Sequence, residues 1–387
     1  MKKGNLGFTI LCICYLLFFL TMGVYTPYLN LYYERVGLTG SQMGTISSAG
    51  YIAAMLFSPL WGAITDKTHK YKAMASFLIL ATGITGLIWQ RQTEFIWIFV
   101  ASLFLSVFRS NIGNVLDAFC VEYSKQNNKE FSTIRSMGSL GYLAGSFIVG
   151  NFMFEVFHIQ GPYMQVLFGI ALLFVCLMLF VKEPEFSNEV SKDHNLKSNM
   201  KELLHNHDYI FILFLSFFTM MILDSTNNYI GNHLIMTMGL EDNAIGIVTC
   251  AMVLPEIFII MNFHKLIKKF GTRKTYLIAI VTQIIRCAIY TMTSNLYVFM
   301  FASVVHGFMV GCGTVCIVSY IHKKVPTYML ATAMTIYGGF TVVGYALQSQ
   351  LFGIIYQLFG SHMIFITTIL FTVIALFMVL KTKRFDD

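Results

Sequence analysis

The chain has 387 residues, of which 56% are hydrophobic and only 12% are charged, with a formal net charge of +7. A soluble domain carries about 25% charged residues, so this composition excludes a soluble globular protein and indicates a membrane protein. The net positive charge does not indicate nucleic-acid binding, because the basic residues lie in short loops between apolar segments. The eight cysteines lie within or beside apolar segments and form no CxxC pair, so neither a disulfide framework nor a metal site is predicted.

Apolar stretches long enough to cross a bilayer, about 20 residues each, follow one another along the chain. The first stretch has no small-residue cleavage site after it and is expected to be a retained span rather than a signal peptide. Twelve spans are predicted, with the first six near residues 8–32, 44–64, 73–89, 95–122, 134–157 and 163–181. The second six are predicted near residues 209–233, 244–264, 276–292, 296–321, 331–357 and 362–380.

A long polar segment separates the two sets of spans. It begins after the sixth span, which Pro184 ends, and it is rich in charge. We therefore predict an N-terminal six-helix bundle over 1–181, a cytoplasmic linker over 182–208 and a C-terminal six-helix bundle over 209–387. One undivided bundle is the alternative. Lys and Arg crowd one set of loops, whereas the opposite set has only Arg35 and Arg91, so both termini are expected in the cytoplasm.

The two halves repeat weakly. The segments WGAITDKTHKYK, residues 61–72, and FHKLIKKFGTRK, residues 263–274, are both short basic loops that follow the second span of their half. Internal repeats are typical of transporters, whose substrate site is expected between the halves near the bilayer midplane.

A few ionisable residues lie inside the predicted spans, where each costs about 2.5–3.5 kcal/mol on insertion scales and needs a partner. They are Arg109, Asp117, Arg135, Asp224, His233, Glu256, Arg286 and His306. Structural ion pairs between helices would explain them. Their spread over both halves favours a solute site with a proton relay, in which Glu256, Arg286 and His306 converge within the C-terminal bundle. Asn227 and Asn228 follow Asp224 and indicate either a wet cavity face or interhelical hydrogen bonds.

The stretch from Asp117 to Gly145 combines an acid, a base and an aromatic side chain. Arg135 offers a fork of donors, Asp117 accepts from hydroxyl groups and Tyr142 offers a flat face. Either the fifth helix begins before Ile134, or the charged pair lies below the midplane.

These residues resemble the major facilitator superfamily, in the branch that contains the lactose permease and the phenylpropionate-permease-like symporters. FFLTMGVYTPYLNLYY resembles the start of the family, and GAITDKTHKYK resembles its signature loop, with His69 in place of the usual Gly. The resemblance implies that Asp117, Arg135 and Tyr142 bind the solute. It assigns a gating role to the signature loop, here Asp66 and Lys67. We assign a gating role also to the Arg-x-x-x-Gly motif, here Arg109 and Gly113. A structural pair of Arg109 with Asp117 is the alternative for the motif.

The second half also resembles the phenylpropionate-permease-like pattern, in VLPEIFII, QIIRCAI and VVHGFMV. Glu256 is expected to carry the proton, with Asp224 as second choice, while Arg286 favours proton release. Met309 stands where the lactose permease has its proton-carrying Glu.

The sequence as a whole predicts an all-α membrane protein of the major facilitator fold that is not an enzyme. It would take up a small polar organic solute together with protons, by alternating access. A sugar or oligosaccharide is the favoured solute. The alternatives are efflux of amphipathic compounds by proton antiport and uptake of an aromatic acid or nucleoside. A membrane enzyme and a transport-dead sensor are less favoured. The expected partners are the solute, protons and the lipid bilayer of the cell membrane; no cofactor, metal or nucleic acid is expected, and the chain is expected to be monomeric.

Overall fold

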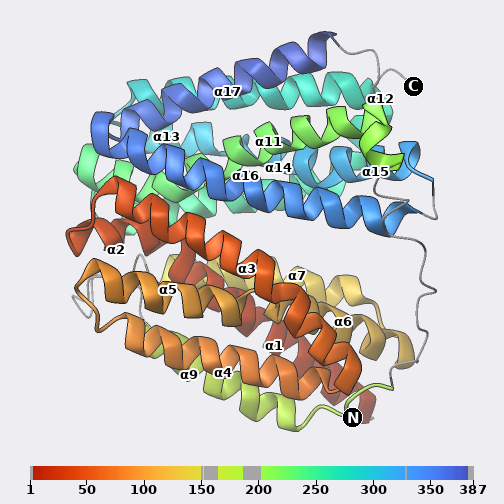
Figure 1. The fold of residues 1–387 in the computed structure, drawn as a ribbon. Helices are drawn as coiled ribbons and strands as arrows, with labels where there is room; N and C mark the ends of the chain where they lie inside the picture. Colours follow the sequence, from red (N-terminus) through yellow and green to blue (C-terminus); the bar gives the residue numbers. More distant parts are fainter. Residues whose placement is uncertain (1–2, 150, 152–163, 186–201, 327–328, 382–387) are drawn as a thin grey trace. The chain divides into compact units, whose positions relative to one another are not determined.

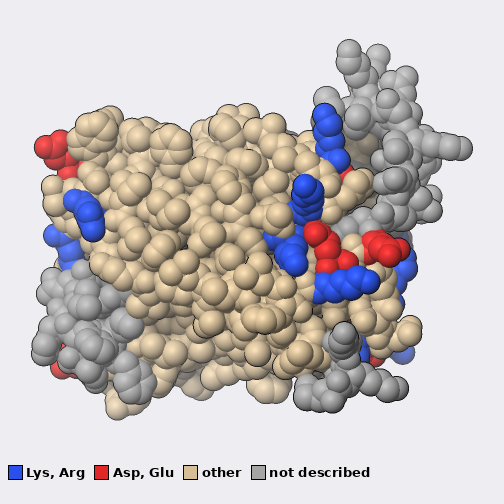
Figure 2. All heavy atoms as spheres, turned by 90° about the horizontal axis from the view of Figure 1, so that it is seen from below, with Lys and Arg blue, Asp and Glu red and all other residues tan. Residues whose placement is uncertain are grey.

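The computed structural model describes residues 3–149, 151, 164–185, 202–326 and 329–381, and every regular element in these ranges is a helix (Figure 1). Eight of the described helices or helix runs are long and apolar enough to cross a membrane. The protein is therefore an all-helical membrane protein. The count of twelve spans and the cytoplasmic position of the termini stay predictions. Figure 2 shows the charged side chains gathered at the two ends of the face in view, with a broad uncharged band between them.

The chain divides into two compact units, Met1–Glu189 and Val190–Asp387. In the first unit the chain runs through α1 (Lys3–Tyr25), the 3₁₀ turn η1 (Thr26–Tyr28), α2 (Leu29–Arg35), α3 (Gly40–Thr68), α4 (Tyr71–Trp89), α5 (Phe95–Arg109), α6 (Ile112–Gln126), α7 (Phe131–Ile148) and α9 (Met164–Leu179). In the second it runs through α11 (His207–Asn232), the π turn η3 (His233–Thr237), α12 (Asn243–Met292), α13 (Leu296–Ser303), α14 (His306–Gly311), the π turn η4 (Cys312–Cys316), α15 (Ile317–Lys324), α16 (Leu330–Phe359) and α17 (Ser361–Lys381).

Local sequence signals account for several helix ends. Thr39 begins α3 with a capping box, in which its side chain accepts from the Gln42 backbone and the Gln42 side chain accepts from the Thr39 backbone. His69 ends α3 in the left-handed conformation, at φ 52°. Glycine adopts the left-handed conformation most easily, which explains why the signature loop usually has a Gly at this place. His69 takes that conformation at some cost in strain. Gly271, at φ 79°, divides α12 into two helices.

The fourth predicted span is interrupted, which the hydropathy pattern did not predict. α5 ends at Arg109 and α6 begins at Ile112. At the break, Ser110 donates to the Val107 carbonyl (2.8 Å), and the Asn111 side chain accepts from Ser58 Oγ (3.1 Å). Such short polar side chains offer the backbone local alternatives to helical bonds. The tenth predicted span is interrupted too, between α13 and α14.

Small residues allow one pair of helices in each unit to pack backbone against backbone. In the first unit, a Cβ added to Gly141 or Gly145 of α7 would collide with carbonyl oxygens of α1. In the second unit, a Cβ added to Gly307 of α14 would lie 2.6 Å from the Cα of Glu256 in α12. Close approach through small residues is a main source of helix association in membranes, because lipid tails remove the hydrophobic driving force between helices.

Gly141→Ala should lower the thermal stability of the purified protein, by about 1–3 kcal/mol for an overpacked contact. The added methyl group meets the Leu16 backbone carbonyl, which cannot move aside like a flexible side chain. Gly169→Ala in α9 is the matched control, because nothing lies within 4 Å of its added Cβ. Thermal unfolding in detergent measures both, and equal midpoints for the two variants would contradict backbone packing at Gly141.

Candidate functional site

Tyr15 links the acid and the base of the predicted solute site. Its hydroxyl group donates to Asp117 Oδ1 (2.7 Å), and Arg135 Nη1 donates to the Tyr15 oxygen (2.8 Å). The Arg135 guanidinium group also lies over the ring of Phe19, 5.2 Å from its centroid. We call Tyr15, Asp117 and Arg135 the Tyr15 cluster. It joins α1, α6 and α7, and it leaves Asp117 half-buried and Arg135 exposed.

The start of α7 bears out one of the two alternatives left by the sequence, that the fifth helix begins before Ile134. α7 begins at Phe131, before Ile134, so Arg135 lies in its second turn. Tyr15 was missed by the sequence reasoning. Its only signal is a polar hydroxyl group in the apolar run CICYLLFF, which hydropathy does not distinguish from packing.

Tyr142 lies close to a different charge. The structure brings its phenol near the guanidinium group of Arg109, with which it interacts electrostatically. Its backbone carbonyl packs against Gly23 of α1. Tyr142 of α7 therefore packs against α1 near Gly23, about two turns further along α1 than Tyr15.

Arg109 ends α5 and reaches toward α1. Its Nη2 donates to Thr26 Oγ1 (3.2 Å) and contacts Met22 Sδ, and the guanidinium carbon lies 4.8 Å from the centroid of the Tyr25 ring. The alternative pair of Arg109 with Asp117 does not form, because the helix break separates them and Asp117 bonds to Tyr15 instead.

The other residues assigned to gating occupy ordinary positions. Gly113, in the first turn of α6, faces the ring of Phe18 at normal contact distance for an added Cβ (3.7 Å). Asp66 and Lys67 lie exposed in the last turn of α3. Asp66 accepts a hydrogen bond from the Tyr71 hydroxyl group (2.7 Å), which joins the end of α3 to the start of α4.

The second unit brings Glu256, Arg286 and His306 together, and we call them the His306 cluster. His306 Nε2 lies 3.7 Å from Glu256 Oε2, while His306 Nδ1 bonds to Arg286 Nη1. A guanidinium group can only donate, so Nδ1 must accept, and the proton of a neutral His306 then sits on Nε2 facing Glu256. The three side chains form a row from a fixed cation, through an imidazole, to a carboxylate.

Two further contacts hold the cation of this cluster. Arg286 Nη2 donates to Thr226 Oγ1 of α11 (2.8 Å), and the guanidinium carbon lies 5.4 Å from the centroid of the Tyr290 ring. Arg286 is fully buried, His306 is nearly so, and the Glu256 side chain keeps 22% of its surface exposed. Thr226 was also missed by the sequence reasoning, since a threonine in a span most often bonds only within its own helix.

Asp224 lies two residues before Thr226 on α11. Asn228 Nδ2 donates to Asp224 Oδ2 (2.9 Å), and Asn227 is exposed. Asp224 also interacts electrostatically with Tyr229 and Tyr345. Among the residues that the structure describes, no group of three or more His, Cys, Asp or Glu side chains is arranged to hold a metal ion.

Comparisons with known proteins agree with this architecture. The family model of the MFS_1 like family matches residues 8–367. The chain is 27% identical to the uncharacterized transporter YwbF of Bacillus subtilis over 84% of this chain and 80% of that protein. It is 24% identical to the maltose permease of Geobacillus stearothermophilus over 91% of each chain. A crystal structure of the nucleoside transporter NupG shares the fold, with a TM-score of 0.86 at 17% identity over 99% of this chain and 100% of that one.

Arg286→Gln should destabilise the protein strongly, by about 3–5 kcal/mol for a broken buried network, because it removes the buried cation that bonds to His306 and Thr226 and that lies behind His306 from the Glu256 carboxylate. The double variant Arg286→Gln with Glu256→Gln should recover part of that loss, since it removes both charges. Unfolding midpoints of the two single variants and the double variant measure the coupling. Additive losses would show that the two charges do not interact.

Proposed function

The chain belongs to the MFS_1 like family of the major facilitator superfamily, and we propose that this membrane transporter takes up a small polar organic solute together with protons. The observation that carries the proposal is the His306 cluster, a carboxylate, an imidazole and a guanidinium group in contact inside candidate spans. A membrane protein keeps such a set at considerable cost, and protonatable groups there usually serve a coupling ion.

In the proposed mechanism Glu256 exchanges protons. When Glu256 is charged, its attraction to Arg286 and to the Nε2–H of His306 holds α12 against α14. Protonation of Glu256 removes the charge and weakens that attraction. His306 is the first residue of α14, directly after the break that follows α13, so this contact acts on a joint between two helices. Asp224 is the second candidate for the proton, because it lies on the same helix as Thr226.

The Tyr15 cluster is the proposed solute site. Asp117 accepts from solute hydroxyl groups, and Arg135 donates in a fork, while Tyr15 holds the two in register. Asn227 and Asn228 of α11 are further candidates for binding solute hydroxyl groups. The likeness to the maltose permease over nearly the whole chain supports a sugar or oligosaccharide. Tyr142 joins the site only for a solute long enough to extend toward Arg109.

Transport would follow alternating access between a half over 1–181 and a half over 209–387, joined by a cytoplasmic linker. The exposed Asp66 and Lys67 would act in the gate at the cytoplasmic mouth, and Arg109 with Gly113 at the helix break. The proposal is a monomer in the cell membrane, with both termini in the cytoplasm and without a cofactor. The alternative is efflux of amphipathic compounds by antiport, in which the solute and the proton move in opposite directions. The vesicle experiment below distinguishes uptake from efflux.

Asp117→Asn and Arg135→Ala should each abolish uptake, and Tyr15→Phe should lower it by about tenfold or more, because it removes two charge-assisted hydrogen bonds. The measurement is uptake of a panel of labelled sugars, nucleosides and aromatic acids into membrane vesicles under pH gradients imposed in both directions. Arg91→Ala, an exposed arginine outside the helices, is the matched control and should transport normally. Full uptake by the Asp117 or Arg135 variant would refute the site, and accumulation only under the reversed gradient would establish efflux.

Glu256→Gln should abolish accumulation driven by the pH gradient while solute exchange across the membrane continues, because exchange needs no net proton movement. Glu241→Gln, at an exposed carboxylate outside the helices, should keep gradient-driven accumulation. Counterflow and gradient-driven uptake in the same vesicles separate the two activities. Unchanged pH dependence in the Glu256 variant would remove it as proton carrier and transfer the role to Asp224 or His306.

A further inference from the structure

Arg109 is a charge within a candidate span that the proposed solute and proton sites leave unexplained. It lies near the middle of the span Phe95–Gln126. Both of its hydrogen bonds use Nη2, and among the described residues neither Nε nor Nη1 has a hydrogen-bond partner. No described carboxylate pairs with it. Within the described part of the chain, the half-buried cation at this place therefore has no counter-charge and few acceptors.

The groups that surround Arg109 offset its charge only in part. Tyr25 presents the face of its ring, and the phenols of Tyr51 and Tyr142 are near enough to interact with the guanidinium group. As the last residue of α5, Arg109 also lies at the negative end of that helix. All of these are neutral or partial charges, whereas charged groups inside membranes normally pair with an opposite charge.

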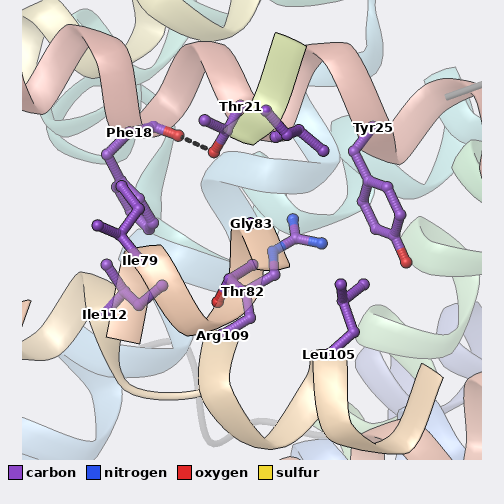
Figure 3. A pocket seen from close by; sticks show the side chains of 10 residues that line it. Phe18, Thr21, Tyr25, Ile79, Thr82, Gly83, Leu105, Arg109 and Ile112 are labelled. Carbon is purple, nitrogen blue, oxygen red and sulfur yellow. Dashed lines mark hydrogen bonds between the residues drawn. The ribbon is translucent and has the colours of Figure 1, made fainter. Parts of the chain in front are cut away.

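Arg109 also lines a cavity. It lies wholly within the first unit, between α1, α4, α5, α6 and α9. Most of its lining is hydrophobic, with the hydroxyl groups of Thr21 and Thr82 bonded to carbonyls of their own helices. Figure 3 shows the Arg109 guanidinium group between Thr21 and Tyr25, with Leu105 and Ile112 on either side. The complete lining is Phe18, Thr21, Tyr25, Ile79, Thr82, Gly83, Leu105, Arg109, Ile112 and Leu167.

We propose that this cavity binds a monocarboxylate with an apolar tail. The carboxylate accepts a fork of hydrogen bonds from Arg109 and supplies the missing counter-charge, and the tail packs against the hydrophobic lining. One cation and an otherwise apolar wall select a single negative charge, so a dicarboxylate or a sugar fits poorly. The site is separate from the Tyr15 cluster, which meets α1 about two turns earlier and has its own acid.

A monocarboxylate of this kind has two sources, free fatty acids from the lipid bilayer and short acids from the aqueous phase. Both present the same group to Arg109 and differ in tail length. The probes are therefore oleate for the first source and butyrate, octanoate and benzoate for the second, each paired with its primary amide. The amide keeps the tail and removes the negative charge.

The test is thermal unfolding and calorimetric titration of the full-length protein in nanodiscs of phosphatidylcholine that has been freed of fatty acids. At least one of the acids should raise the unfolding midpoint of the unaltered protein, and its amide should not. Arg109→Gln should weaken binding of that acid by about 10- to 100-fold, the loss of a charge-assisted pair. Arg109→Lys should bind more weakly than the unaltered protein but better than Arg109→Gln, because Lys keeps the charge and loses the fork. Arg91→Gln is the matched control and should bind like the unaltered protein.

A second variant tests the tail. Thr21→Leu fills the cavity without touching the charge, and its hydroxyl group serves only a carbonyl of its own helix. It should weaken octanoate or benzoate binding more than butyrate binding. The proposal is overturned if no acid is preferred to its amide, or if Arg109→Gln binds the acid as well as the unaltered protein. The acid–amide comparison stands even if Arg109→Gln does not fold. Because binding is measured without transport, its failure leaves the proposed solute uptake untouched.

Discussion

The close approach of two helix backbones at glycine fixes the position of the ionisable groups in each unit. In α7, Gly138 faces the ring of Tyr15, and Gly141 meets the α1 backbone one turn further along. In α14, Gly307 follows His306 directly and packs on the Cα of Glu256. A bulkier residue at these glycines would separate the very side chains that form each cluster. The glycines therefore set distances between charges as well as the packing of helices.

The two helix breaks have a common relation to charge. The fourth stretch of the first unit breaks after Arg109, and the corresponding stretch of the second unit breaks before His306. A break frees carbonyl and amide groups that lipid cannot satisfy, so it is tolerated only where protein or a cavity surrounds it. The carbonyl end that α5 presents at its break favours a cation, which is where Arg109 lies. Interrupted helices with polar groups at the break are a recurring way to build ion and solute sites in transporters.

Hydropathy and charge predicted much of this architecture because both are visible one residue at a time. The cost of Glu256, Arg286 and His306 in apolar stretches predicted that they would meet, and the structure places them in contact. Tyr15 and Thr226 were not predictable in that way, since a hydroxyl group in a span is cheap when it bonds within its own helix. Their partners on other helices depend on how each helix is rotated about its axis, and hydropathy does not predict that rotation. The breaks were not predicted because hydropathy averages over a whole span, and each of the two spans is apolar enough overall for a continuous helix.

The two clusters differ in exposure, and the difference matches the proposed division of roles. A solute must touch the groups that bind it, and Arg135 is exposed while Asp117 is half-buried. A proton needs only one accessible group and a connected chain behind it. In the proposed proton path Glu256 is that group, and the fully buried Arg286 behind it donates to Thr226 of α11. Because α11 also carries Asp224, which accepts from Asn228, the proposed proton carrier connects through His306, Arg286 and Thr226 to the helix of the second candidate for the proton.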